Sequence, residues 1–110
     1  MEHAVRDEPQ GLVVSFCGDV DLENSPRARE VLLRCVAQRK DLLVDLSAVS
    51  YIDSSGVASL VEAFQASKKN GRRFALVAVN DSAMRVLQLA RLDKVFTIHN
   101  TLSDGLRGGA

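Results

Sequence analysis

The sequence has no excess of charge of either sign. Fourteen Lys and Arg residues are balanced by fourteen Asp and Glu residues, so the formal net charge at pH 7 is zero. Proteins that bind nucleic acid or an anionic membrane surface usually carry a basic excess, so we expect no nucleic-acid partner. Long apolar runs are missing too. The longest, such as residues 75–79, span only a few positions, whereas a membrane-spanning helix needs about 20, so we expect no direct insertion into a membrane.

Targeting signals and cysteines are equally scarce. The first ten residues contain Glu2, Asp7 and Glu8 and no apolar stretch, unlike a secretory signal, so we expect a cytoplasmic protein. The two cysteines, Cys17 and Cys35, lack C-x-x-C spacing. In a cytoplasmic chain, isolated cysteines of this kind are expected to be buried, unreactive thiols.

Motifs for nucleotide or metal binding are absent. The sequence has no G-x-x-x-x-G-K phosphate loop. Asp19, Asp21 and Glu23 alternate, but no EF-hand spacing follows them, and such a run is usually a solvated edge. We therefore expect no cofactor and no metal site.

Hydrolytic catalysis also lacks its parts. A nucleophile elbow needs glycine two residues before the serine, and neither Ser54 nor Ser55 has one. The only histidines are His3, near the N-terminus, and His99, after the last expected strand, so no base is supported. We expect a chain without catalytic residues, which is not an enzyme.

The remaining pattern predicts one α/β domain. Its 110 residues can bury a single core, and the apolar periodicity changes repeatedly between strand and helix spacing. Strands are expected at 11–18, 42–46, 74–79 and 95–98, with 3–6 pairing as a fifth across "DEPQG". Because helices separate the last three, these should be parallel neighbours in a mixed sheet of four or five strands.

Helix signals lie between the strands. Ser25 before Pro26 should cap a first helix, and a second should run over about 55–70 and end at Gly71. "NDSAMRVLQLARL" should form a shorter helix, and "TLSDGL" one or two turns. The apolar positions that share one face of the first two helices are Ala28, Leu32, Cys35, Val36, Val57, Leu60, Val61 and Phe64. We expect one domain over 1–110, with its core at about 11–106 and a frayed end at 107–110.

The segment "SYIDSSGVASLVE", residues 50–62, holds the polar residues that could carry function. Asp53, Ser54, Ser55 and Gly56 stand between an expected strand and an expected helix. Asp and Ser there are usually helix caps, and glycine permits a turn or a close approach. The same position could also display a hydroxyl to a partner, and both interpretations stay open on the residues alone.

Three stretches together resemble a known family. "FCGDVDLENSPRAREVLLRCV", "LLVDLSAVSYIDSSGVASLVEAF" and "GRRFALVAVNDSAMRVLQLARLDKVFTIHNTLSDGL" are similar, in order and spacing, to the STAS domain of bacterial anti-sigma factor antagonists. The resemblance covers about residues 11–106. Its most specific part is "VDLSAVSYIDSSG" followed by a helix, and "LARLDKVFTIH" supports it separately.

The resemblance implies a partner-switching regulator. Ser55 would be phosphorylated by a partner that is both anti-sigma factor and serine kinase, and only the unphosphorylated protein would bind that partner and free the sigma factor. A PP2C-type phosphatase is a further implied partner. Asp21 would lie beside the serine loop, so the implied binding residues are Asp21, Asp53, Ser54, Ser55 and Gly56.

A second branch of the same fold remains an alternative. STAS subunits of bacterial lipid-transport (Mla-type) ABC transporters dock on the transporter ATPase, and "GVASLVEAFQASKKNGRRFALVAVND" resembles them nearly as well. Those domains often have Thr and Ala at the positions of Ser54 and Ser55. The phosphorylatable Ser55 therefore favours the sigma-regulator branch.

Overall fold

The computed structural model describes residues 1–107, which form a five-stranded sheet and four helices. The elements in chain order are β1 (Glu2–Glu8), β2 (Gly11–Val20), α1 (Ser25–Ala37), β3 (Leu42–Ile52), α2 (Ser54–Lys69), β4 (Phe74–Val77), α3 (Asp81–Leu89), β5 (Thr97–His99) and α4 (Leu102–Arg107). Arg107 was expected in the frayed end but still belongs to α4. The other positions of that expected end, 108–110, lie outside the described residues.

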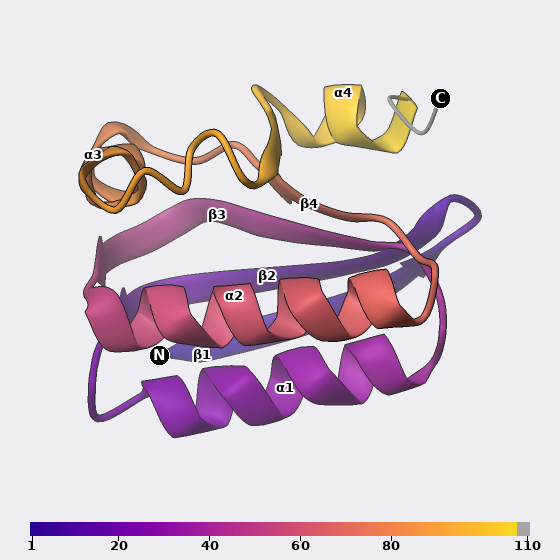
Figure 1. The fold of residues 1–110 in the computed structure, drawn as a ribbon, viewed down its shortest axis with the longest axis horizontal. Coiled ribbons are helices and arrows are strands. Elements are labelled where there is room, and N and C mark those ends of the chain that lie inside the picture. The colour runs from indigo at the N-terminus through magenta and orange to yellow at the C-terminus, as the bar shows by residue number, and fades with distance from the viewer. Residues whose placement is uncertain (108–110) are drawn as a thin grey trace.

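The sheet has the order β1-β2-β3-β4-β5. β1 pairs with β2 in antiparallel orientation, and every other pair is parallel, which confirms the expected mixed sheet. Helices α1 and α2 lie side by side on one face, and α3 and α4 lie on the other (Figure 1). Both α1 and α2 therefore begin at the end of the sheet where β2 and β3 finish.

β3 is longer than the sequence indicated. The apolar run predicted a strand over 42–46, but β3 continues to Ile52. Its second half pairs with the end of β2, past two register irregularities, one between Ser15 and Cys17 and one between Gly18 and Asp19. A bulge breaks the two-residue alternation of side chains, so "SAVSY" does not look like a strand in the sequence. The extension carries the chain directly to Asp53.

The core lies mainly between the sheet and the α1–α2 layer. The four apolar positions predicted for the first helix are all buried, as are Val57 and Leu60 of α2. Val61 and Phe64 are half-buried and pack against this core. The ring of Phe64 meets those of Phe74 and Phe96 at centroid distances of 5.9 and 5.4 Å. The helical spacing thus identified the buried face correctly.

The two cysteines differ in burial. Cys35 is buried on α1, as expected, and desolvation raises the pKa of its thiol. Cys17 is exposed, so the prediction of a second buried thiol is wrong. Its neighbour Phe16 points into the core, and successive side chains of a strand point to opposite faces. Cys17 therefore lies on the face where α3 and α4 pack mainly over β3, β4 and β5.

The first helix starts differently from the sequence interpretation. Asn24, not Ser25, occupies the capping position, and its side chain makes no capping hydrogen bond. Ser25 is the first helical residue, and its hydroxyl donates to the carbonyl of Leu22 at 3.3 Å. The loop before α1 is therefore held by hydrogen bonds within 21–25.

Candidate functional site

The turn between β3 and α2 is built around one carboxylate. Asp53 is the N-cap of α2, and its Oδ1 accepts the backbone N–H groups of Ser55 at 3.0 Å and Gly56 at 3.2 Å. Helix N-termini leave such N–H groups without partners, and a capping carboxylate satisfies them. The predicted capping role therefore falls on Asp53, and neither serine has to supply it.

Ser55 lies half-buried in the first turn of α2, while Ser54 is exposed. The Ser55 hydroxyl donates to Asp53 Oδ1 at 2.5 Å. This bond, and then those from the backbone, hold the pKa of the Asp53 carboxyl below its usual value against the opposing effect of desolvation. The hydroxyl is thus placed at a helix N-terminus and oriented by an ionised neighbour.

Gly56 allows this turn to lie against the end of β2. A Cβ atom at Gly56 would stand 2.3 Å from the carbonyl oxygen of Val20 and 2.8 Å from Cγ1 of Ile52. The backbone N–H of Asp53 donates to the same carbonyl of Val20 at 3.4 Å. Gly56 is therefore required by close backbone packing, and its role in partner binding remains a prediction.

The loop that follows β2 lies beside the turn formed by residues 53–56, which we call the serine turn. Leu22 donates its backbone N–H to Asp53 Oδ2 at 3.1 Å, so the two segments share one carboxylate. Asp21, on the same loop, is half-buried, and its Oδ1 accepts from the backbone and the side-chain amide of Asn24 at 3.0 and 2.9 Å. Asp21 therefore precedes the residue that bonds to the turn, and its own carboxylate holds the loop together. Its role in partner binding remains a prediction.

Apolar side chains surround these polar groups. Leu22 is 75% exposed and Tyr51, two residues before Asp53, is 52% exposed. A groove of about 570 Å³ begins at Ser54 and runs between α2 and α3, lined by Val61, Val86 and other apolar residues. The turn therefore presents a hydroxyl and carboxylates within an exposed apolar surface, which is the composition of a protein-binding face.

One cation also lies near the hydroxyl. Arg29 of α1 and Glu62 of α2 form an exposed ion pair, and both line a hollow of about 450 Å³ together with Ser55. His99 lines a different cavity, and His3 lies exposed on β1. Within residues 1–107, no group of three or more His, Cys, Asp or Glu side chains is placed to hold a metal ion. The same residues include no helix long and apolar enough to cross a membrane.

Known proteins share the sequence pattern and the architecture of this chain. Residues 2–105 match the STAS domain. The chain belongs to the STAS domain family. It is 34% identical to the anti-sigma-F factor antagonist RsfB of Mycobacterium tuberculosis, over 96% of this chain and 88% of that protein.

Two further relatives agree with this assignment. The anti-sigma-B factor antagonist of Bacillus subtilis is 27% identical over 94% of both chains. The crystal structure of an anti-sigma factor antagonist from Mycobacterium paratuberculosis superposes with a TM-score of 0.90 at 30% identity, covering 97% of this chain and 92% of that one. The family and the α/β architecture that the sequence resemblance implied are confirmed.

Sequence reasoning identified most of the residues at this turn but missed Leu22 and Arg29. Leu22 is an exposed apolar residue in an acidic loop, a contrast visible in "DVDLEN". Arg29 pairs with Glu62 across 33 positions of sequence, and no local pattern signals that contact. Only the packing of α1 against α2 brings the pair beside Ser55.

Proposed function

We propose that this STAS domain is a cytoplasmic anti-sigma factor antagonist. In its unmodified form it binds an anti-sigma factor that is also a serine kinase, and phosphorylation of Ser55 releases it. The observation that carries the proposal is the Ser55 hydroxyl, placed in the first turn of α2 and oriented by Asp53 within an exposed apolar face. The names of the relatives support the same conclusion.

Charge explains why phosphorylation would weaken binding. A phosphoryl group brings about −1.5 to −2 charges at neutral pH. It also removes the proton that Ser55 donates to Asp53, so an attraction becomes a repulsion between two anions. The N-terminus of α2 favours the new charge, so the effect on folding should be small. A docked partner, in contrast, would have to desolvate a dianion next to Asp53, which is costly.

The proposed function requires the chain to bind a partner and requires no catalytic turnover by the chain itself. Ser55 has a carboxylate as its hydroxyl partner, and that carboxylate is engaged by three backbone N–H groups. A carboxylate whose pKa is held low is a weak base, so Ser55 is poorly activated as a nucleophile. The kinase would supply the activation, and a PP2C-type phosphatase would restore the hydroxyl.

The first experiment locates the modification. The cognate kinase and ATP should phosphorylate wild type and Ser54→Ala at Ser55, and should leave Ser55→Ala unmodified, as read by intact-mass and peptide mass spectrometry. Phosphate transfer to another residue in the Ser55→Ala variant would refute Ser55 as the acceptor.

The second experiment tests the effect of charge on binding. Ser55→Asp should bind the kinase at least tenfold more weakly than wild type, about 1.4 kcal/mol. Ser82→Asp is a matched control, because Ser82 is exposed and is also the second residue of a helix, α3. Equal weakening in both variants would indicate a general charge effect. Tight binding instead to the ATPase of a lipid-transport ABC system would favour the transporter branch.

A further inference from the structure

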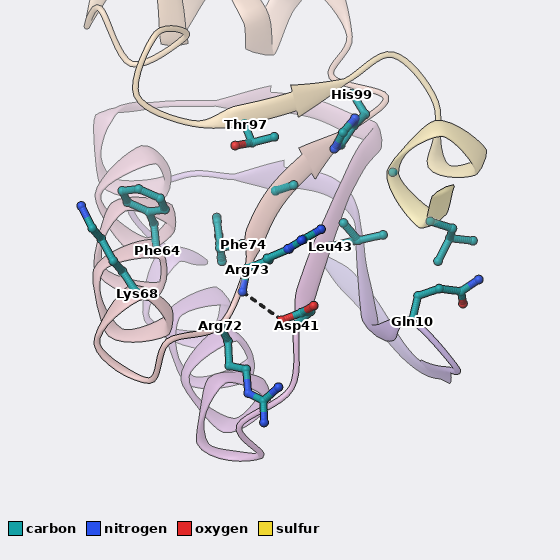
Figure 2. A pocket seen from close by; sticks show the side chains of 13 residues that line it. Gln10, Asp41, Leu43, Phe64, Lys68, Arg72, Arg73, Phe74, Thr97 and His99 are labelled. Carbon is teal, nitrogen blue, oxygen red and sulfur yellow. Dashed lines mark hydrogen bonds between the residues drawn. The ribbon is translucent and has the colours of Figure 1, made fainter. Parts of the chain in front are cut away.

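A further cavity, of about 470 Å³, lies near the starts of β3 and β4, and α2 on one face of the sheet and α4 on the other both contribute to its lining (Figure 2). Its floor is formed by Leu43, Ala75 and Thr97, which stand side by side on β3, β4 and β5 in parallel register. The volume lies within the roughly 300–1,000 Å³ typical of small-molecule sites. Nine residues of β3, 44–52, separate Leu43 in this cavity from Asp53 at the serine turn.

Short elements leave the cavity open. The edge strand β5 has only three residues, and α4, with only six, covers just part of the sheet face on which it packs. α4 sits close to the sheet, because a Cβ at Gly105 would stand 2.6 Å from Cγ1 of Val77 and 3.3 Å from Cδ1 of Leu43. Phe64 and Lys68, from α2, bound the opposite side (Figure 2). The concavity is therefore framed by packed elements.

The lining carries more positive than negative charge. Lys68, Arg72 and Arg73 line the cavity, and Asp41 is its only carboxylate among the described residues. The ion pairs of residues 1–107 include none of these three cations. Asp41 instead accepts the backbone N–H of Arg73 at 3.0 Å, drawn as the dashed line in Figure 2. The cationic heads are thus available to a bound anion.

The cations of the site lie beside its apolar groups. Figure 2 shows Arg73 extending across the cavity on the side of Leu43, while Lys68 and Arg72 stand at its edges. Side chains that can contact a carbon skeleton are Leu43, Phe64, Phe74, Ala75 and Leu106. The hydroxyl of Thr97 and the ring of His99 add polar groups that could orient a ligand.

We propose that this cavity binds a small organic anion, a phosphate monoester with an apolar body about the size of a phenyl ring. Guanidinium groups match phosphate oxygens in paired hydrogen bonds, so Arg73 would hold the phosphate. Lys68 and Arg72, at the edges of the cavity, would favour the anion through their positive charge. The surplus of cations over Asp41 suits a doubly charged group. Phe64, Leu43 and Leu106 would contact the apolar body. These contacts would make the ester bind more tightly than inorganic phosphate.

The test is a titration of the ¹⁵N-labelled chain with phenyl phosphate, followed by NMR. Saturable shifts should concentrate at 41–43, 72–75 and 97–99 and leave 54–56 unchanged. Inorganic phosphate and phenol, the two parts of phenyl phosphate, should both bind at least fivefold more weakly. Equal affinity for inorganic and phenyl phosphate would overturn the proposed ligand class, as would shifts centred on Ser55.

A pair of variants tests Arg73. Losing a charge-assisted hydrogen bond should make Arg73→Gln bind phenyl phosphate at least tenfold more weakly. Arg85→Gln makes the same change at an exposed position of α3 outside the cavity and should bind like wild type. Thermal melting checks that both variants fold, which we expect because Arg73 is exposed. Equal losses in the two variants, or none in Arg73→Gln, would overturn the site.

Discussion

The two ends of the sheet carry opposite charge, although the chain as a whole is neutral. Where β2 and β3 finish, the side chains include Asp19, Asp21, Glu23 and Asp53. Where β3 and β4 start, six cations outnumber the three carboxylates Asp7, Glu8 and Asp41; the cations are Arg39, Lys40, Lys68, Lys69, Arg72 and Arg73. The net charge of zero is the sum of the charges over the whole chain. It therefore does not exclude a cationic surface at one end and an acidic surface at the other.

The parallel crossovers explain this separation. Each connection that returns the chain to a parallel strand places helix N-termini at one end of the sheet and C-termini at the other. Anions are stabilised near helix N-termini and cations near C-termini. Asp53 caps α2, Asp81 lies in the first turn of α3, and Lys68 and Lys69 lie in the last turn of α2. The proposed switch and the proposed anion pocket thus use opposite ends of the same helix.

Replacing glycine by alanine should give the largest difference in stability between the two ends. Gly56→Ala places a Cβ against backbone and core atoms and should lower the free energy of unfolding by about 3 kcal/mol. Gly71→Ala, at the cationic end, meets open space and suffers only from its φ of 70°, at about 1 kcal/mol. Denaturant unfolding measures both values. Equal losses would contradict the close packing at Gly56.

Replacing an asparagine by alanine should also lower the free energy of unfolding more at the acidic end than at the cationic end, with a smaller difference between the ends than for the glycines. Asn80 accepts the N–H of Ala83 at 2.9 Å and donates to the carbonyl of Val49 at 2.5 Å, so Asn80→Ala should cost about 2 kcal/mol. Asn70 makes one side-chain bond, to the carbonyl of Val36, and Asn70→Ala should cost about 1 kcal/mol. Thermal or denaturant melts would show a reversed order if the cap of α3 were unimportant.

The smallest effect concerns the titration of Asp53. Because its pKa is lower in the folded than in the unfolded chain, its carboxylate stabilises the fold above the ordinary pKa of about 4 and loses that effect as pH falls. Ser55→Ala removes the strongest cause and should raise the pKa of Asp53, whereas Ser54→Ala should not. Carbon-detected NMR titration reads both. An unchanged pKa in Ser55→Ala would contradict the orienting hydrogen bond.

Local sequence signals predicted the elements, the parallel order and the helix faces. They failed at Cys17 and in the second half of β3, because bulges and uneven helix coverage depend on neighbouring strands. They also assigned the cap of α1 to Ser25 instead of Asn24, and the strands expected over 74–79 and 95–98 differ from β4 and β5. Asp53 and Gly56 were found because a cap and a close approach follow from neighbouring residues. The anion pocket could not be found this way, since its lining comes from Gln10, Asp41, Phe64 and other positions spread over most of the chain.

The central claim is that charge at Ser55 controls association while the opposite end of the sheet does not. The direct measurement is the affinity of the cognate anti-sigma factor kinase for the unmodified chain, the Ser55-phosphorylated chain and the unmodified Arg73→Gln variant, by calorimetry under one salt condition. We predict at least a tenfold loss on phosphorylation, about 1.4 kcal/mol, and no change for Arg73→Gln. Equal affinities of the phosphorylated and unmodified chains would contradict the account.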